Sequence, residues 1–219
     1  MKKLVIFDLD GTLLDTIEDL GNATNYALRS LGFPERTRDE YYRLVGRGIT
    51  NLFKGAVPAG CDDPETIAAM RERFLGHYGI HLCDCTHPYP GIPELLDSIA
   101  SRGVKLAVAS NKYQEGAETV IRHFFGRHAW SAVLGQQEGF PLKPDPGIVA
   151  LCRQAAGDVP KEDVLYVGDS NVDMQTGLNA GVDTVGVTWG FRTREELEAF
   201  HPLAVVDAPE ELEKLILGA

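Results

Sequence analysis

The sequence predicts an α/β protein in which a doubly wound, Rossmann-like parallel sheet carries a small helical cap domain inserted after the first strand. Short apolar runs alternate with segments of helical pattern along the later part of the chain. The runs are almost continuously apolar, which is typical of strands covered on both faces. The first run ends near Asp8 and the next begins near Val104, so a segment far longer than a simple crossover connects the first two strands.

The expected strands and helices follow one another in the order of a doubly wound sheet. The apolar runs occupy residues 3–7, 104–109, 131–135, 164–168, 183–188 and 203–207. Helical patterns occupy residues 92–103, 146–157 and 171–181, and a further helix is expected at the C-terminus. Strands that alternate with helices predict a parallel sheet with helices on its faces.

The long segment after the first strand is helical in pattern. Within it, PETIAAMRERFLGHYGIHL has apolar residues at helical spacing, which predicts one buried helix face. These residues are Ile67, Met70, Phe74 and Tyr78. We therefore expect residues 16–84 to form a helical cap, and residues 1–15 and 85–219 to form the α/β core.

Composition and charge exclude several classes of partner. Hydrophobic residues make up 44% of the chain, which supports a substantial core, and the formal net charge is −11. Nucleic acids and anionic membranes need clustered basic residues, so we expect neither as a partner. Asp8 and Asp10 interrupt the apolar run that follows Lys2 and Lys3, so no signal peptide is expected and the predicted location is cytoplasmic. The sequence leaves open whether the protein is a monomer or a homodimer.

Two carboxylates stand at the end of the first expected strand, in VIFDLDGTLLDT. In an extended segment, residues two apart point the same way, so Asp8 and Asp10 approach one site. Open parallel sheets bind ligands at the carboxyl ends of their strands. Like charges held close together oppose each other's ionisation. The pair therefore requires a compensating positive charge.

Later strand ends supply further polar groups at the same edge of the sheet. Ser110 and Asn111 follow the second expected strand, and Lys143 lies in the loop after the third. Asp169 follows the fourth, with Asp173 four residues further on. Hard oxygen ligands without thiolate or imidazole favour Mg²⁺ as the compensating ion.

An acidic cluster with Mg²⁺, a lysine and a hydroxyl suits a phosphoryl group. Mg²⁺ and Lys143 would neutralise its oxygens, while Ser110 would hold them. Asp8 could attack phosphorus and form an aspartyl-phosphate. Asp10 could protonate the leaving oxygen and later activate water.

Four motifs in order resemble those of the haloacid dehalogenase superfamily. They are Asp8-x-Asp10-Gly11-Thr12, Ser110-Asn111, Lys143-Pro144 and Gly168-Asp169-Ser170-x-x-Asp173. The helical insert resembles the small cap of that superfamily. The stretch GTLLDT is typical of its phosphoglycolate phosphatase-like branch.

The resemblance implies a phosphatase that acts on a small phosphorylated metabolite, with 2-phosphoglycolate as the leading candidate. It implies that Asp8 is nucleophile and Mg²⁺ ligand, and that Asp10 is acid and base and binds Mg²⁺ through its backbone carbonyl. Asp169 would bind the metal directly. The phosphoryl group would be held by Ser110, Asn111 and Lys143.

Other activities within and outside the superfamily compete with this interpretation. Dehalogenases lack the second aspartate of the first motif, and phosphonatases usually have alanine there, so Asp10 favours phosphate esters. A sugar phosphomutase similar to β-phosphoglucomutase is the alternative enzyme. A phospho-signalling receiver domain is the non-enzymatic alternative, although such domains lack a large helical insert after the first strand.

The cap offers one candidate for substrate specificity. In LVGRGITNLF, residues 44–53, two glycines flank Arg47. A flexible loop of this kind would let Arg47 reach a substrate carboxylate in a bidentate fork. The alternative is a solvated loop in which Arg47 contacts no ligand.

Overall fold

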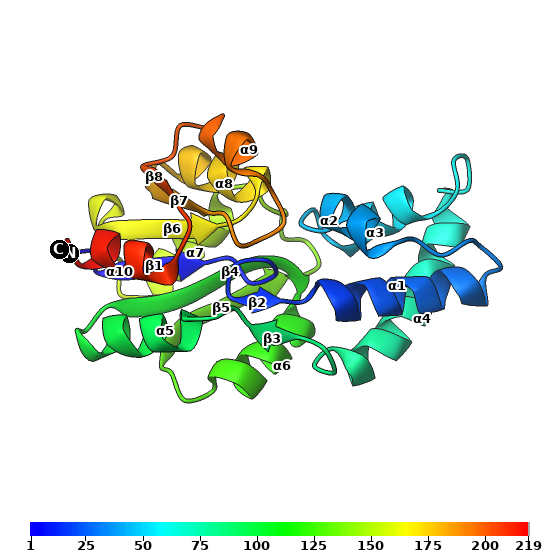
Figure 1. Ribbon diagram of the computed structural model, residues 1–219, viewed down its shortest axis with the longest axis horizontal. Helices are drawn as coiled ribbons and strands as arrows, with labels where there is room; N and C mark the ends of the chain where they lie inside the picture. The colour runs from blue at the N-terminus through cyan, green and yellow to red at the C-terminus, as the bar shows by residue number, and fades with distance from the viewer. Residues whose placement is uncertain (219) are drawn as a thin grey trace.

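The computed structural model describes residues 1–218 and contains a six-stranded parallel sheet of order β5-β4-β1-β6-β7-β8 (Figure 1). Its strands are β1 (Leu4–Phe7), β4 (Lys105–Tyr113), β5 (Trp130–Gln136), β6 (Val164–Gly168), β7 (Asp183–Val187) and β8 (Ala204–Val206). The chain builds β4 and β5 on one side of β1 and then β6, β7 and β8 on the other. The order therefore reverses at β1, and the carboxyl ends of parallel strands form a ligand crevice at such a reversal.

Helices cover both faces of the sheet, as the apolar runs predict. They are α5 (Ile92–Ser101), α6 (Gln114–Phe125), α7 (Gly147–Ala155), α8 (Asn171–Ala180), α9 (Arg194–Glu198) and α10 (Pro209–Leu217), with a short 3₁₀ turn η1 (Lys161–Asp163). All four residues of β1 are fully buried. Val5 and Phe7 join the larger core cluster, which includes residues of α5, α6 and α10, whereas Leu4 and Ile6 join the cluster under α7. This division explains why the strand is apolar without alternation.

The predicted α/β class is confirmed, and every predicted apolar run forms a strand. The second strand differs from the prediction at its end. Ser110 and Asn111 lie inside β4, which continues to Tyr113, rather than in a loop after it. Pairing between β4 and β5 is irregular between Ala109 and Tyr113. Ser110 and Asn111 therefore have extended backbone, but they lie outside the regular pairing of β4 with β5.

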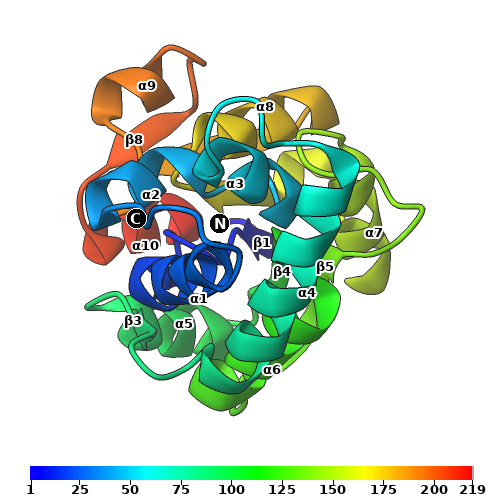
Figure 2. The same ribbon diagram turned by 90° about the vertical axis from the view of Figure 1, so that its right-hand side faces the viewer.

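Four helices, α1 (Ile17–Ser30), α2 (Arg38–Leu44), α3 (Ile49–Ala56) and α4 (Pro64–His81), pack together beyond the sheet (Figure 1). Viewed from that end, they stand in front of β1 and β4 (Figure 2). The apolar face predicted for α4 is buried from Ile67 to Tyr78. The helix begins at Asp63, whose carboxylate accepts hydrogen bonds from the next free backbone N–H groups, and Pro64 opens its first turn.

The two connections between sheet and helices are joined to each other. Strand β2 (Leu14–Asp15) pairs antiparallel with β3 (His87–Pro88). Nearby, the buried Asp19 carboxylate of α1 accepts hydrogen bonds from the backbone N–H groups of Cys85 and Thr86 and from the Thr86 hydroxyl. Because a buried carboxylate requires such donors, this contact ties the returning chain to the start of α1.

Within residues 1–218, none of the helices combines the length and the apolar character that crossing a bilayer would demand.

Close packing of α8 on β7 gives a test of this fold. A Cβ atom at Gly177 would lie 1.9 Å from the Thr184 hydroxyl oxygen. We expect Gly177→Ala to lower the free energy of unfolding by roughly 1–3 kcal/mol, because the core must shift to accept it. Gly76 of α4 faces open space, so Gly76→Ala should raise stability by up to about 1 kcal/mol. Urea unfolding measures both, and equal effects would contradict the described packing.

Candidate active site

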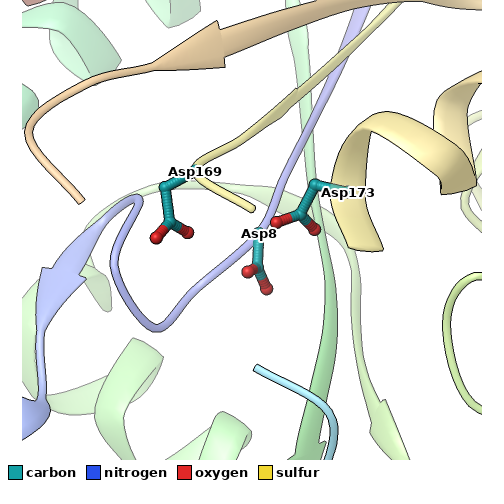
Figure 3. Close-up of side chains that lie close together, drawn as sticks. All are labelled: Asp8, Asp169 and Asp173. Carbon is teal, nitrogen blue, oxygen red and sulfur yellow. The ribbon is translucent and has the colours of Figure 1, made fainter. Parts of the chain in front are cut away.

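Three carboxylates meet at the carboxyl ends of β1 and β6. Oxygens of Asp8, Asp169 and Asp173 lie within 4.8 Å of one another, and all three residues are buried. Asp8 follows β1, Asp169 follows β6 and Asp173 lies in the first turn of α8 (Figure 3). The reversal of strand order at β1 therefore brings together acids that lie far apart in the sequence.

Asp173 is positioned by the start of α8. Ser170 and Asp173 form a capping box, in which each side chain bonds the other's backbone N–H. The other carboxylate oxygen of Asp173 accepts hydrogen bonds from Lys143 at 2.7 Å and from the Tyr166 hydroxyl at 3.2 Å. With both oxygens occupied, Asp173 serves to orient Lys143.

Lys143 is the cation at the centre of the acidic cluster. Its ammonium lies 2.8 Å from Asp8 and 2.7 Å from Asp173, and it donates a third bond to the Ala109 carbonyl. These partners use all three donors of the lysine. Burial opposes the charge, but the two carboxylates outweigh it, and the pKa of Lys143 is raised well above its ordinary value.

Asp169 is held between two loops. It accepts hydrogen bonds from the Thr12 hydroxyl at 3.1 Å and from the Phe191 backbone N–H at 2.7 Å. A Cβ atom at Gly11 or Gly190 would lie within about 2.3 Å of this side chain. Only glycine fits at these two positions, because any larger residue would displace the carboxylate.

The cluster carries more negative than positive charge. Burial and the charge on Asp173 raise the pKa of Asp8 well above its ordinary value, although Lys143 opposes the shift. Burial and the same neighbour raise the pKa of Asp169 to about 7. Both shifts come first from burial and then from the neighbouring carboxylate, and the one lysine at the centre of the cluster does not neutralise three acids. The oxygen donors of Asp8 and Asp169 therefore suit a hard divalent ion such as Mg²⁺.

Asp10 lies apart from the three buried acids and is paired with a second lysine. Lys112 Nζ donates to Asp10 Oδ1 at 3.0 Å and to the Tyr78 hydroxyl at 2.6 Å. Tyr78 comes from α4, so this contact joins the sheet to the four-helix group. Neither Lys112 nor Tyr78 was predicted as a site residue, and the helical pattern placed Tyr78 only on a buried face. The signal for Lys112 was its place two residues after Ser110, on the same side of an extended strand.

Ser110 and Asn111 lie beside the acids, as predicted. The Ser110 hydroxyl accepts a hydrogen bond from the Lys112 backbone N–H. The Asn111 side chain, which was expected to bind the phosphoryl group, is hydrogen-bonded to backbone groups. Its oxygen accepts a hydrogen bond from the Lys143 backbone N–H, and its amide donates to the carbonyls of Lys143 and Gly46. Asn111 therefore links the loop that carries Lys143 to the loop between α2 and α3.

A small cavity of about 40 Å³ lies between the sheet and the four helices. The sheet side is polar and the helix side is mostly apolar. From the sheet it is lined by Asp8, Asp10, Ser110, Asn111, Lys112 and Tyr113. From the helices it is lined by Leu20, Val45, Gly46, Gly48, Ile49, Leu52 and Tyr78. The predicted nucleophile and the predicted acid thus line the same cavity.

Arg47 lies outside this cavity. Its side chain is exposed, and it borders a separate hollow together with Asn51, Pro144 and Asn171. Its flanking glycines, Gly46 and Gly48, line the cavity instead. The loop therefore borders the cavity with its glycines, while the side chain of Arg47 lies outside it, and the specificity role of Arg47 stays a prediction.

Arg192, like Asn111, bonds the backbone near the loop between α2 and α3. The Arg192 guanidinium donates to the carbonyls of Tyr42, Arg43 and Val45 at the end of α2. A cation suits the C-terminal carbonyls of a helix. The preceding residue, Phe191, donates its N–H to Asp169. Arg192 was not predicted as a functional residue, because nothing in its local sequence distinguishes it from an exposed basic residue.

The chain is similar to known phosphatases along almost its whole length. The family model described as haloacid dehalogenase-like hydrolase matches residues 5–187. A phosphoglycolate phosphatase of Agrobacterium fabrum is 34% identical over 225 residues, covering 99% of this chain and 95% of that protein. One of Mannheimia succiniciproducens is 30% identical and covers 98% of each chain. The crystal structure of a predicted phosphoglycolate phosphatase from Haemophilus somnus has a TM-score of 0.89 at 29% identity, covering 98% of this chain and 97% of that one.

The raised pKa of Asp169 predicts a pH-dependent stability difference in metal-free protein. The unfolded chain ionises this carboxyl near pH 4, whereas the folded chain ionises it at about pH 7. Folding is therefore penalised increasingly as pH rises from 4 to 7, and the penalty persists above 7. In EDTA, Asp169→Asn should be more stable than the wild type at pH 8, and this advantage should shrink towards pH 5. Thermal unfolding across this range measures it, and a pH-independent difference would contradict the assignment.

Proposed function

Since the chain belongs to the haloacid dehalogenase-like hydrolases, we propose that it hydrolyses 2-phosphoglycolate in a Mg²⁺-dependent reaction through an aspartyl-phosphate. The observation that carries this proposal is the position of Asp8. Its buried carboxylate borders the cavity between the sheet and the four helices, lies 2.8 Å from Lys143 and shares that cavity with Asp10. The names of the Agrobacterium and Mannheimia relatives support the choice of substrate.

The metal assignment follows from the charge of the site. Asp8 and Asp169 would hold Mg²⁺, with Asp10 contributing its backbone carbonyl. The bound ion would supply positive charge that neutralises phosphoryl oxygens. Asp173 remains with Lys143, because both of its oxygens already accept hydrogen bonds.

The chain's own residues account for two successive displacements at phosphorus. In the first, an oxygen of Asp8 bonds to phosphorus while the bond from phosphorus to the ester oxygen breaks, and Asp10 gives its proton to that oxygen. In the second, Asp10 takes a proton from water as the water attacks phosphorus, and Asp8 is released as a carboxylate. The Ser110 hydroxyl would hold a phosphoryl oxygen during both displacements, while the positive charge of Lys143, which stays bonded to Asp8 and Asp173, would attract the phosphoryl oxygens without donating a further hydrogen bond.

The lining of the cavity favours a substrate with a short leaving group. Beside Asp8 and Asp10, the helix side presents mainly the apolar side chains of Leu20, Val45, Ile49 and Leu52, with Tyr78 as the polar one. Such a surface offers few partners for the hydroxyl groups of a sugar phosphate, which a phosphomutase would have to bind. We propose that residues 16–84 act as the cap that encloses the substrate, over a core formed by residues 1–15 and 85–219, whose last residue lies outside the described part of the chain.

Phosphate release tests the proposed function directly. With Mg²⁺ and a panel of small phosphate esters, we expect 2-phosphoglycolate to give the highest kcat/KM, and EDTA to abolish the release. A matched assay with added sugar bisphosphate tests the phosphomutase alternative. Broad, weak release would leave phosphatase activity but contradict the substrate assignment, and conversion of a sugar phosphate without phosphate release would favour the mutase.

Replacement of the nucleophile gives a separate prediction. Asp8→Asn removes the attacking oxygen while keeping the shape of the side chain, so turnover should fall by roughly 10³-fold or more. Circular dichroism and thermal unfolding should show a folded protein, because the neutral amide reduces charge repulsion among the buried acids. Near-normal turnover by a homogeneous sample of this variant would exclude Asp8 as nucleophile.

A further inference from the structure

We propose that Lys112, oriented by Tyr78, binds a carboxylate that the substrate carries on the same carbon as its phosphate ester. This inference rests on the proposed function and names the residue that would select the leaving group. The phosphoryl group and the leaving group need separate partners, and the partners of the phosphoryl group are already described. The leaving group must occupy what remains of the cavity, beside Asp10.

Lys112 has a hydrogen-bond donor left over. A lysine ammonium has three N–H donors and no acceptor. Within residues 1–218, Lys112 Nζ donates to Asp10 and to Tyr78, which uses two of the three. The residue is only 4% exposed and lines the cavity. A buried charged donor without a partner favours a ligand that accepts a hydrogen bond.

Tyr78 adds a second free donor at the same place. Its hydroxyl oxygen accepts the hydrogen bond from Lys112, so its own proton is directed elsewhere. In the described part of the chain this proton meets no acceptor, and Tyr78 also lines the cavity. Lys112 N–H and Tyr78 O–H therefore present two adjacent donors, which match the two oxygens of a carboxylate.

No other cation competes for this role inside the cavity. Among the lining residues of the described chain, Lys112 is the one that carries positive charge. Lys143 has all three donors engaged with Asp8, Asp173 and a backbone carbonyl. Arg47 is exposed and outside the cavity. The helix side offers mainly Leu20, Val45, Ile49 and Leu52, which suit the short carbon skeleton of a leaving group rather than its charge.

The distance from Asp10 limits where the carboxylate can be on the substrate. An acid that protonates the ester oxygen lies within about 3.2 Å of it, and Lys112 Nζ lies 3.0 Å from Asp10 Oδ1. When both groups contact the same oxygen of Asp10, the ester oxygen and Nζ are at most about 6 Å apart, and an ammonium–carboxylate hydrogen bond takes about 2.8 Å of this distance. The remaining gap fits a carboxylate on the carbon that bears the ester oxygen. One more methylene would overreach it.

The test compares substrates that differ only in this carboxylate. The wild type and Lys112→Met are assayed with three phosphate esters. They are 2-phosphoglycolate, 2-hydroxyethyl phosphate, whose leaving group has the same length but no charge, and 3-phosphooxypropanoate, whose leaving group is one methylene longer. The preference for 2-phosphoglycolate over the neutral ester, expressed in kcat/KM, should fall by roughly 10–100-fold in Lys112→Met. A rise in KM for the charged substrate should account for this fall. If Lys112→Met acted only by disturbing Asp10, it should lower kcat for the charged and the uncharged substrate by the same factor.

Two further variants separate charge recognition from general damage. Tyr78→Phe keeps the ring and removes the hydroxyl, so it should lower the same preference by roughly 3–10-fold. Lys54→Met makes the same chemical change at an exposed lysine of α3 and should leave the preference unchanged. Arg47→Ala tests the sequence-based alternative. If Arg47→Ala lowers the preference and Lys112→Met does not, Arg47 holds the carboxylate and our inference is wrong.

A binding measurement covers the case in which Lys112→Met turns over neither substrate. Calorimetric titration of Asp8→Asn with Mg²⁺ should show tighter binding of 2-phosphoglycolate than of 2-hydroxyethyl phosphate. Addition of Lys112→Met to that variant should remove the difference, and an unchanged difference would overturn the inference. If the wild type releases phosphate from no ester at all, the proposed function fails instead, which this binding comparison distinguishes from a failure at Lys112.

Discussion

The contact between Lys143 and the buried acids is the interaction on which the site depends. Asp8, Asp169 and Asp173 are gathered by the reversal of strand order at β1, and burial makes their ionisation costly. One ammonium with all of its donors engaged reduces this cost and fixes the orientation of Asp8. The residual negative charge is what makes the site attractive to a divalent cation. Stability and chemistry are therefore opposed here, because the charge that penalises folding is the charge that binds metal.

Local sequence patterns were sufficient for the parts of the protein that local physics determines. Unbroken apolar runs predicted each strand of the sheet, because β1 is buried on both faces, and helical spacing predicted the buried face of α4 from Ile67 to Tyr78. The motif residues Asp8, Asp10, Ser110, Lys143 and Asp169 could be placed together because parallel strands end at one edge. Their meeting in the structure agrees with that expectation, while their catalytic roles remain predictions.

Contacts between the sheet and the four helices could not be predicted in the same way. Lys112 and Tyr78 are 34 residues apart and meet across the cavity, and periodicity assigned Tyr78 only to a buried face. Arg192 donates a hydrogen bond to the Val45 carbonyl at the end of α2, 147 residues earlier in the chain. Its local sequence resembles that of any exposed arginine. Arg47 shows the converse: its flanking glycines line the cavity while its side chain does not, and the direction of one side chain depends on packing that a linear pattern does not contain.

The joined connections at β2, β3 and Asp19 set the way in which α1–α4 can move. Two independent linkers would let the four-helix group shift, tilt and twist, and each of these freedoms would be lost whenever a ligand was enclosed. Here both linkers are tied at one place, so fewer of these freedoms exist to be lost. We expect that enclosing a very small molecule then requires less binding energy than it would with two free linkers. Such an arrangement suits an enzyme whose ligand offers few atoms with which to hold a lid shut.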